Sequence, residues 1–267
     1  MHGKRERDFV MPKFFVSDRL KQGGTATITG DDGRHIARIL RMGPGDILEV
    51  VDSTGKQYSA RIRDCSSQGV ILDIINGCTN VCLEPLISIT VLQGLPKGNK
   101  MDKIVRMNTE IGVSRFVPVI TERSIPRLEE VTRNARVNRW RRIAREASKQ
   151  SGRQHVPEVY DIIKFDDAMK LVLEEKTHAK SRGRESLILL PWELETSKGI
   201  KCILKEKPGF SEVLCFIGPE GGFSHSEVEK AVRHGANLCT LGPRILRTET
   251  CAIVLSSIIL YEAGEMR

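Results

Sequence analysis

The sequence predicts an α/β protein with two parts: a small β-barrel in residues 1–80 and a larger domain with a mostly parallel sheet in residues 81–267. In the first part, short stretches alternate apolar with polar residues, which is typical of half-exposed strands joined by turns. In the second part, near-continuous apolar runs alternate with helical patterns, as in parallel sheets with right-handed helical crossovers. The polar stretch at residues 76–85 contains Gly, Asn and Pro and predicts a linker between the two parts.

The first part contains the pattern of many short strands around one helix, which favours a small barrel. The expected strands are residues 13–16, 25–29, 47–52, 57–64 and 69–75, and the expected helix is residues 33–42.

The pattern of the second part predicts alternating strands and helices. Gly112 is expected to end the first of these helices in a left-handed conformation. A polar, basic stretch at residues 177–185 is expected to be a loop. The expected strands are residues 86–92, 116–120, 187–190, 213–217 and 238–241, and the expected helices are residues 101–111, 133–151, 165–175, 224–234 and 249–261.

Two loops rich in Gly and Pro follow the last two predicted strands, and each leads into a helix. The first contains Gly218 and Pro219, and the second contains Gly242 and Pro243. Glycine allows positive φ and a close approach of the backbone to a ligand, while proline stiffens the loop. Gly-Pro pairs also occur in ordinary turns. Because both loops lie at the carboxyl ends of strands, where open α/β sheets bind ligands, we interpret them as a binding site.

The net charge of +8 is concentrated in the middle of the chain, where residues 81–160 carry 15 Lys or Arg against 8 Asp or Glu. The predicted helix at 133–151 is the main source of this surplus. Arginine is suited to phosphate contacts, so the pattern favours RNA or DNA as a partner. The alternative is a solvated helix face. The basic residues of this helix are Arg133, Arg136, Arg139, Arg141, Arg142, Arg145 and Lys149, and Arg153 follows it.

Several classes of protein are excluded by the sequence. No apolar run is long enough to span a bilayer, and no signal-peptide core follows the charged N-terminus, so we expect no membrane association. Seven scattered cysteines favour reduced thiols and a cytoplasmic location. Cys78 and Cys82 lack a second ligand pair, and we expect no metal. Dinucleotide, phosphate-loop and Gly-x-Ser-x-Gly motifs are missing.

Five motifs resemble those of a known family. Residues 216–222 (Phe-Ile-Gly-Pro-Glu-Gly-Gly) and 241–250 (Leu-Gly-Pro-Arg-Ile-Leu-Arg-Thr-Glu-Thr) are similar to the two cofactor-loop motifs of the SPOUT methyltransferases. The segment 35–46, the segments 97–102 and 109–112, and the basic segment 145–153 are similar to the N-terminal, first catalytic-domain and basic-helix patterns of one branch. This branch is the ribosomal RNA small subunit methyltransferase E family, and the similarity covers nearly the whole chain.

The resemblance implies an N-terminal PUA-like domain for RNA and a C-terminal SPOUT domain with a deep trefoil knot. It also implies a homodimer whose cofactor site lies at the subunit interface. The cofactor implied is S-adenosylmethionine, and the partner is small-subunit ribosomal RNA within the assembled subunit. The implied cofactor-binding residues are Leu190, Pro191, Gly218, Pro219, Glu220, Gly222, Leu241, Gly242, Leu246 and Thr248. The implied RNA-binding residues are Lys13, Arg38, Arg41, Arg145 and Arg153.

The reaction implied is methylation of N3 of a uridine in 16S ribosomal RNA. Arg247 is the first candidate to stabilise the negative charge that develops on the uracil carbonyls, and Arg244 or an arginine of the basic helix is the second. Glu249 is a candidate to accept the N3 proton or to hold Arg247, and its alternative role is that of an acidic residue favoured at a helix N-terminus. Thr248 and Thr250 are expected to cap this helix.

Two other functions stay open from the sequence. A related enzyme could methylate the ribose 2′-oxygen, since other SPOUT enzymes do so. A non-enzymatic RNA-binding factor in ribosome assembly is the second alternative. The two intact loops count against this second alternative, because an empty pocket would not need them.

Overall fold

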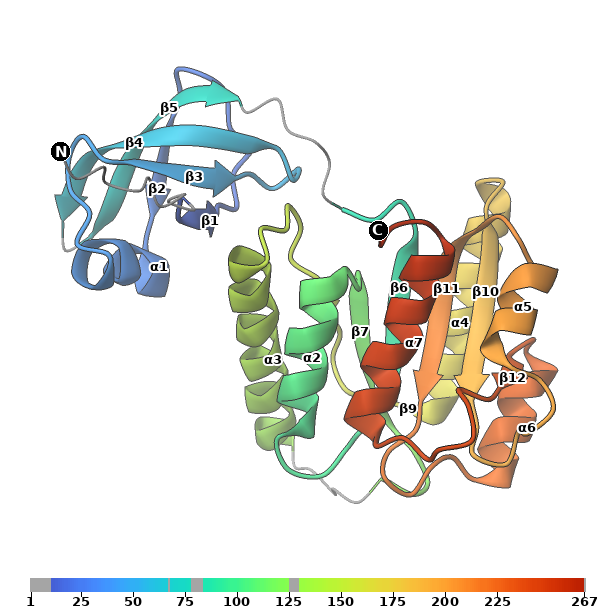
Figure 1. Cartoon of the computed structure of the whole chain (residues 1–267). Coiled ribbons are helices and arrows are strands. Elements are labelled where there is room, and N and C mark those ends of the chain that lie inside the picture. Colours follow the sequence, from blue (N-terminus) through green and yellow to red (C-terminus); the bar gives the residue numbers. More distant parts are fainter. Residues whose placement is uncertain (1–10, 67, 78–83, 125–129, 267) are drawn as a thin grey trace, which may run out of the picture. The chain divides into compact units, whose positions relative to one another are not determined.

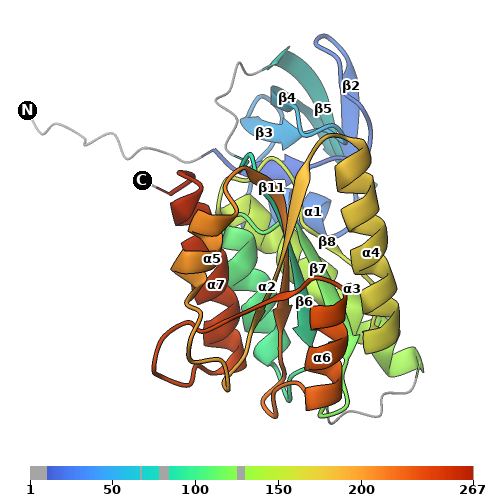
Figure 2. The same cartoon turned by 90° about the vertical axis from the view of Figure 1, so that its right-hand side faces the viewer.

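The computed structural model describes residues 11–66, 68–77, 84–124 and 130–266. The chain forms two compact units. Unit 1 comprises residues 1–83 with residues 149–155, and unit 2 comprises residues 84–148 with residues 156–267. The predicted linker at residues 76–85 falls largely outside the described residues, as do Cys78 and Cys82. Figures 1 and 2 show the elements of both units.

Unit 1 contains a five-stranded sheet in the order β1-β3-β4-β5-β2, and β1 is the strand that pairs in parallel. Phe14, Ile36, Leu48 and Leu72 are among the side chains that fill its core. The small β domain predicted from the sequence is therefore confirmed. Its strands are β1 (Lys13–Phe15), β2 (Thr25–Ile28), β3 (Ile47–Val51), β4 (Gln57–Ser66) and β5 (Gly69–Gly77).

The helix expected at residues 33–42 differs from the observed one. The chain instead forms α1 (Gly30–Arg34) and then a single π-helical turn, η1 (His35–Ile39). Arg41 has a φ of 54°, which a regular α-helix does not allow. The regular helix therefore starts earlier and ends earlier than the pattern predicts, and Arg38 lies on the π turn.

Unit 2 contains a seven-stranded sheet in the order β12-β10-β11-β6-β7-β8, with β9 also paired to β7. The strand pairs are all parallel. The α/β class with a parallel sheet is thus confirmed. The strands are β6 (Ser88–Gly94), β7 (Arg115–Ile120), β8 (Glu158–Val159), β9 (Ile163–Lys164), β10 (Glu185–Pro191), β11 (Phe210–Ile217) and β12 (Asn237–Cys239).

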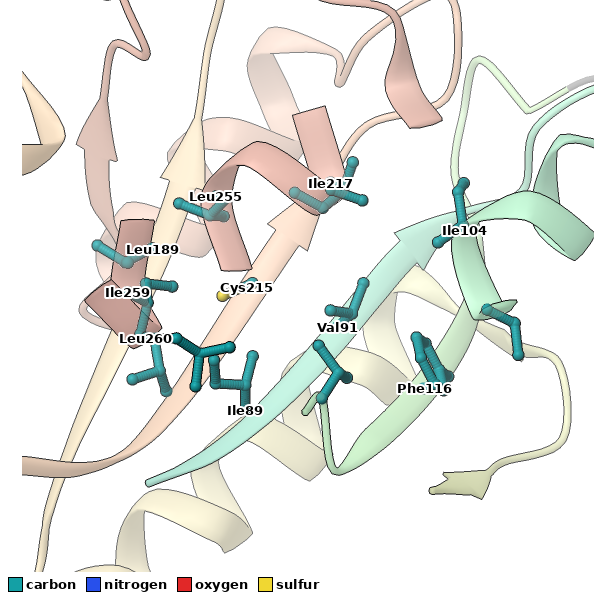
Figure 3. Packing of buried hydrophobic residues seen from close by; sticks show 14 of the residues in the cluster. Ile89, Val91, Ile104, Phe116, Leu189, Cys215, Ile217, Leu255, Ile259 and Leu260 are labelled. Atoms are coloured by element: carbon teal, nitrogen blue, oxygen red, sulfur yellow. The ribbon is translucent and has the colours of Figure 1, made fainter. Parts of the chain in front are cut away.

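Helices cover both faces of this sheet, which gives three layers (Figure 2). On one face, apolar residues of α2, α3, α5 and α7 pack on the strands, and Figure 3 shows Leu255 and Ile259 of α7 against Leu189 and Cys215. On the other face, α4 and α6 cover alternate strand residues such as Leu214. The helices are α2 (Lys100–Ile111), α3 (Glu130–Gln150), α4 (Phe165–Ser181), α5 (Ile200–Glu206), α6 (His225–Arg233) and α7 (Thr248–Glu262).

Most predicted elements of unit 2 are present, with two corrections. Gly112 ends α2 with a φ of 117°, as expected for a left-handed cap. The loop expected at residues 177–185 is confined to residues 182–184, because α4 continues to Ser181 through the buried Ala179 and β10 begins at Glu185. The short helix α5 was not predicted at all; it buries Ile200 and Ile203 against the sheet.

The order of the strands creates a switch point between β6 and β11. From β6 the chain moves to β7 on one side, whereas β10, β11 and β12 lie on the other side. Ligands of open α/β sheets bind at such a point, outside the carboxyl ends of the strands. The last residue of β11, Ile217, lies opposite Gln93 near the end of β6. The first predicted binding loop, which follows Ile217, therefore begins at the switch point.

Candidate active site

Loops from four parallel strands meet at the carboxyl edge of the unit 2 sheet. They follow β6 (residues 95–99), β10 (192–199), β11 (218–224) and β12 (240–247). Several contacts join them. Trp192 N–H donates to the Cys239 carbonyl at 3.1 Å, and Thr240 N–H donates to the Lys198 carbonyl at 2.9 Å. The Thr248 hydroxyl, in the first turn of α7, donates to the Gly218 carbonyl at 2.6 Å.

The loop at residues 218–222 is held at each of its ends by close packing. Pro219 lies so near Gly94 of β6 that a Cβ on Gly94 would stand 2.5 Å from Pro219 Cδ. Gly218 and Gly222 also approach each other, since a Cβ on Gly218 would lie 3.1 Å from Gly222 Cα. Gly222 has a φ of 66°, which favours glycine. The motif glycines thus serve a compact turn with little space for side chains.

Side chains from three other segments fix the middle and the end of this loop. Glu220 accepts from Lys97 N–H at 3.0 Å and pairs with Lys100 Nζ at 2.7 Å. Arg123 donates to the Gly221 carbonyl at 2.9 Å. The Glu193 carboxylate lies against Gly222, where a Cβ would stand 2.6 Å from Oε1. The loop is therefore pre-organised by the surrounding protein.

The pKa of Glu220 lies below its ordinary value although partial burial alone would raise it. Hydrogen bonds from Lys100, from its own N–H and from Lys97 N–H stabilise the carboxylate. Glu220 was predicted to bind the cofactor. In this structure its side chain instead contacts Lys97 and Lys100, while its backbone forms part of the loop at residues 218–222.

The second predicted loop is largely exposed. Gly242 has a φ of 113°, and its N–H donates to Thr240 Oγ1 at 3.2 Å. Arg244 is exposed, and Ile245 is 89% exposed. Leu241 and Leu246 are half-buried, with Leu241 packed against the core. The loop thus presents both apolar and basic side chains beside exposed backbone.

Arg247 and Glu249 lie at the start of α7. Arg247 is exposed at the N-cap position, and its side chain makes no capping bond. Glu249 is half-buried in the first turn, where the helix dipole favours an acidic group. Its Oε2 atom is buried and has no hydrogen-bond partner among the described residues. No ion pair joins these two described side chains, so Glu249 does not hold Arg247 by a salt bridge in this conformation.

The capping role expected for Thr248 and Thr250 is wrong. The N-cap residue is Arg247, and α7 begins at Thr248. The Thr248 side chain is 6% exposed and bonds across to Gly218 instead. A hydroxyl in the first turn of a helix can hydrogen-bond either to its own backbone or to a neighbouring loop. The sequence alone does not indicate which of these two partners it binds.

The remaining cofactor candidates lie at the same edge. Leu190 is buried under α4 and α6, so only its backbone can reach a ligand. Pro191 is half-buried at the end of β10. Beyond it, the ring of Trp192 meets that of His225 edge-on, with centroids 5.4 Å apart. The structure therefore brings the predicted loops together around β10, β11 and α7.

Gln93 is a site residue that sequence reasoning missed. It is fully buried at the end of β6, and its amide nitrogen donates to Thr248 Oγ1 at 2.9 Å. The available signal was a glutamine near the end of a largely apolar strand, next to the loop at residues 95–99. Buried polar side chains usually have hydrogen-bond partners, so a partner was to be expected for this glutamine.

The predicted RNA-binding residues of unit 1 differ in exposure. Arg38 and Arg41 are exposed on and after the π turn. Lys13 donates to the Gly152 carbonyl at 2.8 Å and is half-buried. Arg153 is only 6% exposed. Among the predicted RNA-binding residues of this unit, Arg38 and Arg41 are thus the exposed ones.

In unit 2, the basic helix α3 is partly committed to structural contacts. Arg139 forms an ion pair with Asp102 at 2.6 Å, and Arg141 pairs with Asp161 at 3.0 Å. Arg142 is exposed and Arg145 is half-buried. The charge count from the sequence therefore overstates the number of α3 arginines available to a polyanion.

Two features are absent from the part of the chain that the structure describes. Within residues 11–66, 68–77, 84–124 and 130–266, no three His, Cys, Asp or Glu side chains are grouped so as to hold a metal ion. No helix in the same ranges has the length and apolar character needed to cross a membrane.

Comparisons with known proteins show which family the chain is similar to. Residues 83–260 match the model of the RNA methyltransferase domain, and residues 28–75 match that of the RNA methyltransferase PUA domain. The ribosomal RNA small subunit methyltransferase E of Bacillus subtilis is 30% identical over 96% of this chain and 99% of its own. That of Aquifex aeolicus is 32% identical over 94% of this chain and 99% of its own.

A solved structure shows the same fold. The crystal structure of ribosomal RNA small subunit methyltransferase E from Neisseria gonorrhoeae, bound to S-adenosylmethionine, has a TM-score of 0.82 and 29% identity. The structural alignment covers 94% of this chain and 97% of the Neisseria chain. The RNA methyltransferase domain model spans more than half of the chain, and the curated relatives align along almost all of it. The chain therefore belongs to the ribosomal RNA small subunit methyltransferase E family.

Proposed function

We propose that this protein transfers the methyl group of S-adenosylmethionine to N3 of a uridine in small-subunit ribosomal RNA. The observation that carries the proposal is the pre-organised loop at residues 218–222, joined to the start of α7 by Thr248 at the switch point of the sheet. The curated relatives named above act on small-subunit ribosomal RNA, and the Neisseria structure holds the cofactor.

The residues at this edge fit such a cofactor. Gly242 presents exposed backbone at a positive φ, and no atom lies within 4 Å of where its Cβ would be. Leu241 and Leu246 are partly exposed apolar side chains suited to an adenine ring. The exposed Glu193 carboxylate offers negative charge to a cationic ligand. When bound, the cofactor supplies an activated methyl group on a sulfonium.

We assign the proton and charge chemistry to α7. Loss of the N3 proton leaves negative charge on the uracil O2 and O4 atoms, and an exposed guanidinium at Arg247 stabilises that charge as it develops. Glu249 accepts the N3 proton through its carboxylate, one oxygen of which has no partner among the described residues. The deprotonated N3 then takes the methyl group.

We assign RNA binding to residues 1–80 together with α3, and methyl transfer to residues 81–267. In the first part, Arg38 and Arg41 are the foremost candidates because they are exposed. Lys13, Arg145 and Arg153 are proposed to have supporting roles close to the RNA. Phosphate contacts of this kind position a nucleic acid without reading its sequence.

We also propose that the protein is a homodimer joined through α7. This helix carries apolar residues all round, whereas a surface helix normally has one polar face. Ile253 and Val254 are only half-buried in the single chain, and Tyr261 is 68% exposed. A Val254→Glu substitution is expected to give a monomer in light scattering; a dimer of unchanged stability would contradict this interface.

The decisive experiment identifies the product. The protein is incubated with labelled S-adenosylmethionine and small ribosomal subunits that lack the modification, and the RNA is digested to nucleosides. We expect label in 3-methyluridine. Label in a 2′-O-methyl nucleoside would overturn the choice of target atom, and cofactor binding without any label would indicate another RNA substrate. Absence of cofactor binding would favour an assembly factor without enzymatic activity.

A further inference from the structure

The Gln93 side chain is surrounded by hydrogen-bond acceptors at the switch point. It is fully buried, and its Nε2 atom lies 2.8 Å from the Gly94 carbonyl and 2.9 Å from Thr248 Oγ1. The carbonyls of Ile217 and Gly218 follow at 3.4 Å each. At the other end of the amide, Oε1 is buried and meets no hydrogen-bond partner among the described residues.

These neighbours determine which end of the amide is which. Three of the four groups around Nε2 are carbonyls, which only accept, so a nitrogen with two protons is required there. The fourth group, the Thr248 hydroxyl, gives its own proton to Gly218 at 2.6 Å and must therefore accept from Gln93. A relay thus runs from the Gln93 amide through Thr248 to the Gly218 carbonyl.

The relay joins three segments that are distant in sequence. Gln93 is the penultimate residue of β6, Gly218 begins the loop after β11, and Thr248 begins α7. Hydrogen bonds in such a chain polarise and strengthen one another in a buried setting. Because both proposed cofactor loops meet at Thr248, the relay fixes their mutual position before a ligand arrives.

We propose that Gln93 is a positioning residue that sets cofactor affinity by holding Gly218 and Thr248 in register. This inference rests on the proposed function, since it concerns the same cofactor site. It assigns no contact between Gln93 and the ligand: Gln93 acts through the loop. The donor end of its amide is the part that matters, because the other end is not engaged by any described residue.

The test is a double-mutant cycle read by calorimetry with S-adenosylmethionine. Gln93→Met keeps an unbranched chain but removes the donor, and Thr248→Val removes the hydroxyl. Each is expected to weaken binding about tenfold, the effect of losing one buried hydrogen bond. Since both changes break one relay, the double variant should be weakened by much less than about a hundredfold. Thr248→Ser, which keeps the hydroxyl, should weaken binding less than Thr248→Val does.

A fourth variant tests the orientation of the amide. Gln93→Glu preserves the size of the side chain but turns an oxygen toward carbonyls that can only accept. At pH 8 it should bind the cofactor more weakly than Gln93→Met does. If only the size of the side chain mattered, Gln93→Glu would affect binding less than Gln93→Met. Tighter cofactor binding by the Glu variant than by the Met variant would therefore overturn the proposal.

Asn108 provides a matched control. It is also fully buried in unit 2, donates to one backbone carbonyl at 2.9 Å, and has an Oδ1 atom without a partner among the described residues. Its bond is local to α2, since the acceptor is Ile104. Asn108→Leu is therefore expected to change the stability of the protein without changing cofactor affinity.

Hydrogen exchange of the ligand-free protein separates this inference from the proposed function. The Gly222 N–H, which donates to the Pro219 carbonyl at 3.0 Å, should exchange faster in Gln93→Met but not in Asn108→Leu. Unchanged exchange in this loop would overturn the positioning role, whether or not the cofactor binds. A wild-type protein that binds no S-adenosylmethionine would overturn the proposed function instead, and the exchange result would still decide the role of Gln93.

Discussion

Gly94 offers a direct test of whether the shape of the loop at residues 218–222 determines cofactor binding. The residue ends β6, and its φ is not positive, so an alanine there causes no backbone strain of its own. Its only effect is steric. A Cβ would lie 2.5 Å from Pro219 Cδ, 2.8 Å from Pro219 N and 3.2 Å from the Ile217 carbonyl oxygen.

The size of the effect follows from these distances. Carbon atoms in contact need about 3.5 Å, so Pro219 must recede by about 1 Å. The obstacle is a proline ring and backbone rather than a flexible side chain, and overpacking of this kind costs about 1–3 kcal/mol of stability. Because Pro219 leads the cofactor loop, we expect Gly94→Ala to weaken S-adenosylmethionine binding about tenfold, or about 1.4 kcal/mol. Methyl transfer should fall further, since a shift of about 1 Å can cost about a hundredfold in rate.

Gly199→Ala is the matched control for this change. Gly199 lies at the same edge of the sheet, before α5, with a φ of −73° and no atom within 4 Å of its Cβ position. Its substitution should cost less than about 1 kcal/mol of stability and leave binding unchanged. Urea unfolding and calorimetry give both quantities. If Gly94→Ala bound the cofactor as tightly as Gly199→Ala, the loop geometry would not control affinity.

Three further predictions concern other parts of the chain. Arg247→Ala should lower the rate of methyl transfer about a hundredfold or more and keep cofactor affinity, as measured by single-turnover kinetics and calorimetry; weaker binding at an unchanged rate would contradict its role. Replacing both Arg38 and Arg41 by Ala should raise the KM for RNA and reduce its dependence on salt, while cofactor binding stays as it is. Burial raises the pKa of Cys239 and of Cys251 to about 12. At pH 8 both thiols are therefore protonated, and an alkylating reagent should leave them unmodified in the native protein but not in urea, as read by peptide mass spectrometry.

The fold was largely predictable because the apolar pattern of the second domain is strong. Strands such as β6 and β11 are buried on both faces and stand out as apolar runs, and a glycine at residue 112 marks the end of α2. The positions of the binding loops follow from these strands, since parallel strands place their carboxyl ends at one edge. The trefoil knot stays a prediction, because it concerns the path of the chain rather than its local pattern.

Two kinds of feature could not be predicted from local patterns. The polar composition of residues 177–185 indicated a loop, yet burial of Ala179 extends α4 by tertiary packing. Side-chain partners were the second kind. Whether Thr248 caps its own helix or bonds to Gly218 depends on a loop 30 residues away. The role of Gln93 depends in the same way on two segments far along the chain.

Glu220 shows how a motif residue can serve the shape of a site and still affect binding. The sequence placed it among the cofactor residues, but its carboxylate bonds to Lys97 N–H and Lys100. These bonds anchor the middle of the loop to the start of α2. We therefore expect Glu220→Ala to weaken cofactor binding, whereas Glu220→Gln, which can still accept from Lys97 N–H, should weaken it less.

The pH dependence of binding distinguishes this anchoring role from direct contact. The pKa of Glu220 is lowered from 4.5 in the folded protein, so its anchoring is fully present above pH 4.5 and is lost as the pH falls through the lower, folded pKa. Cofactor affinity of the wild type, measured by calorimetry toward acid pH while the protein stays folded, should therefore fall only below pH 4.5. Glu220→Gln cannot titrate at this position and should show a flatter profile. Parallel profiles for the two proteins would show that the charge of Glu220 does not support the loop, because the same anchoring contact would then be equally strong with and without an ionised carboxylate.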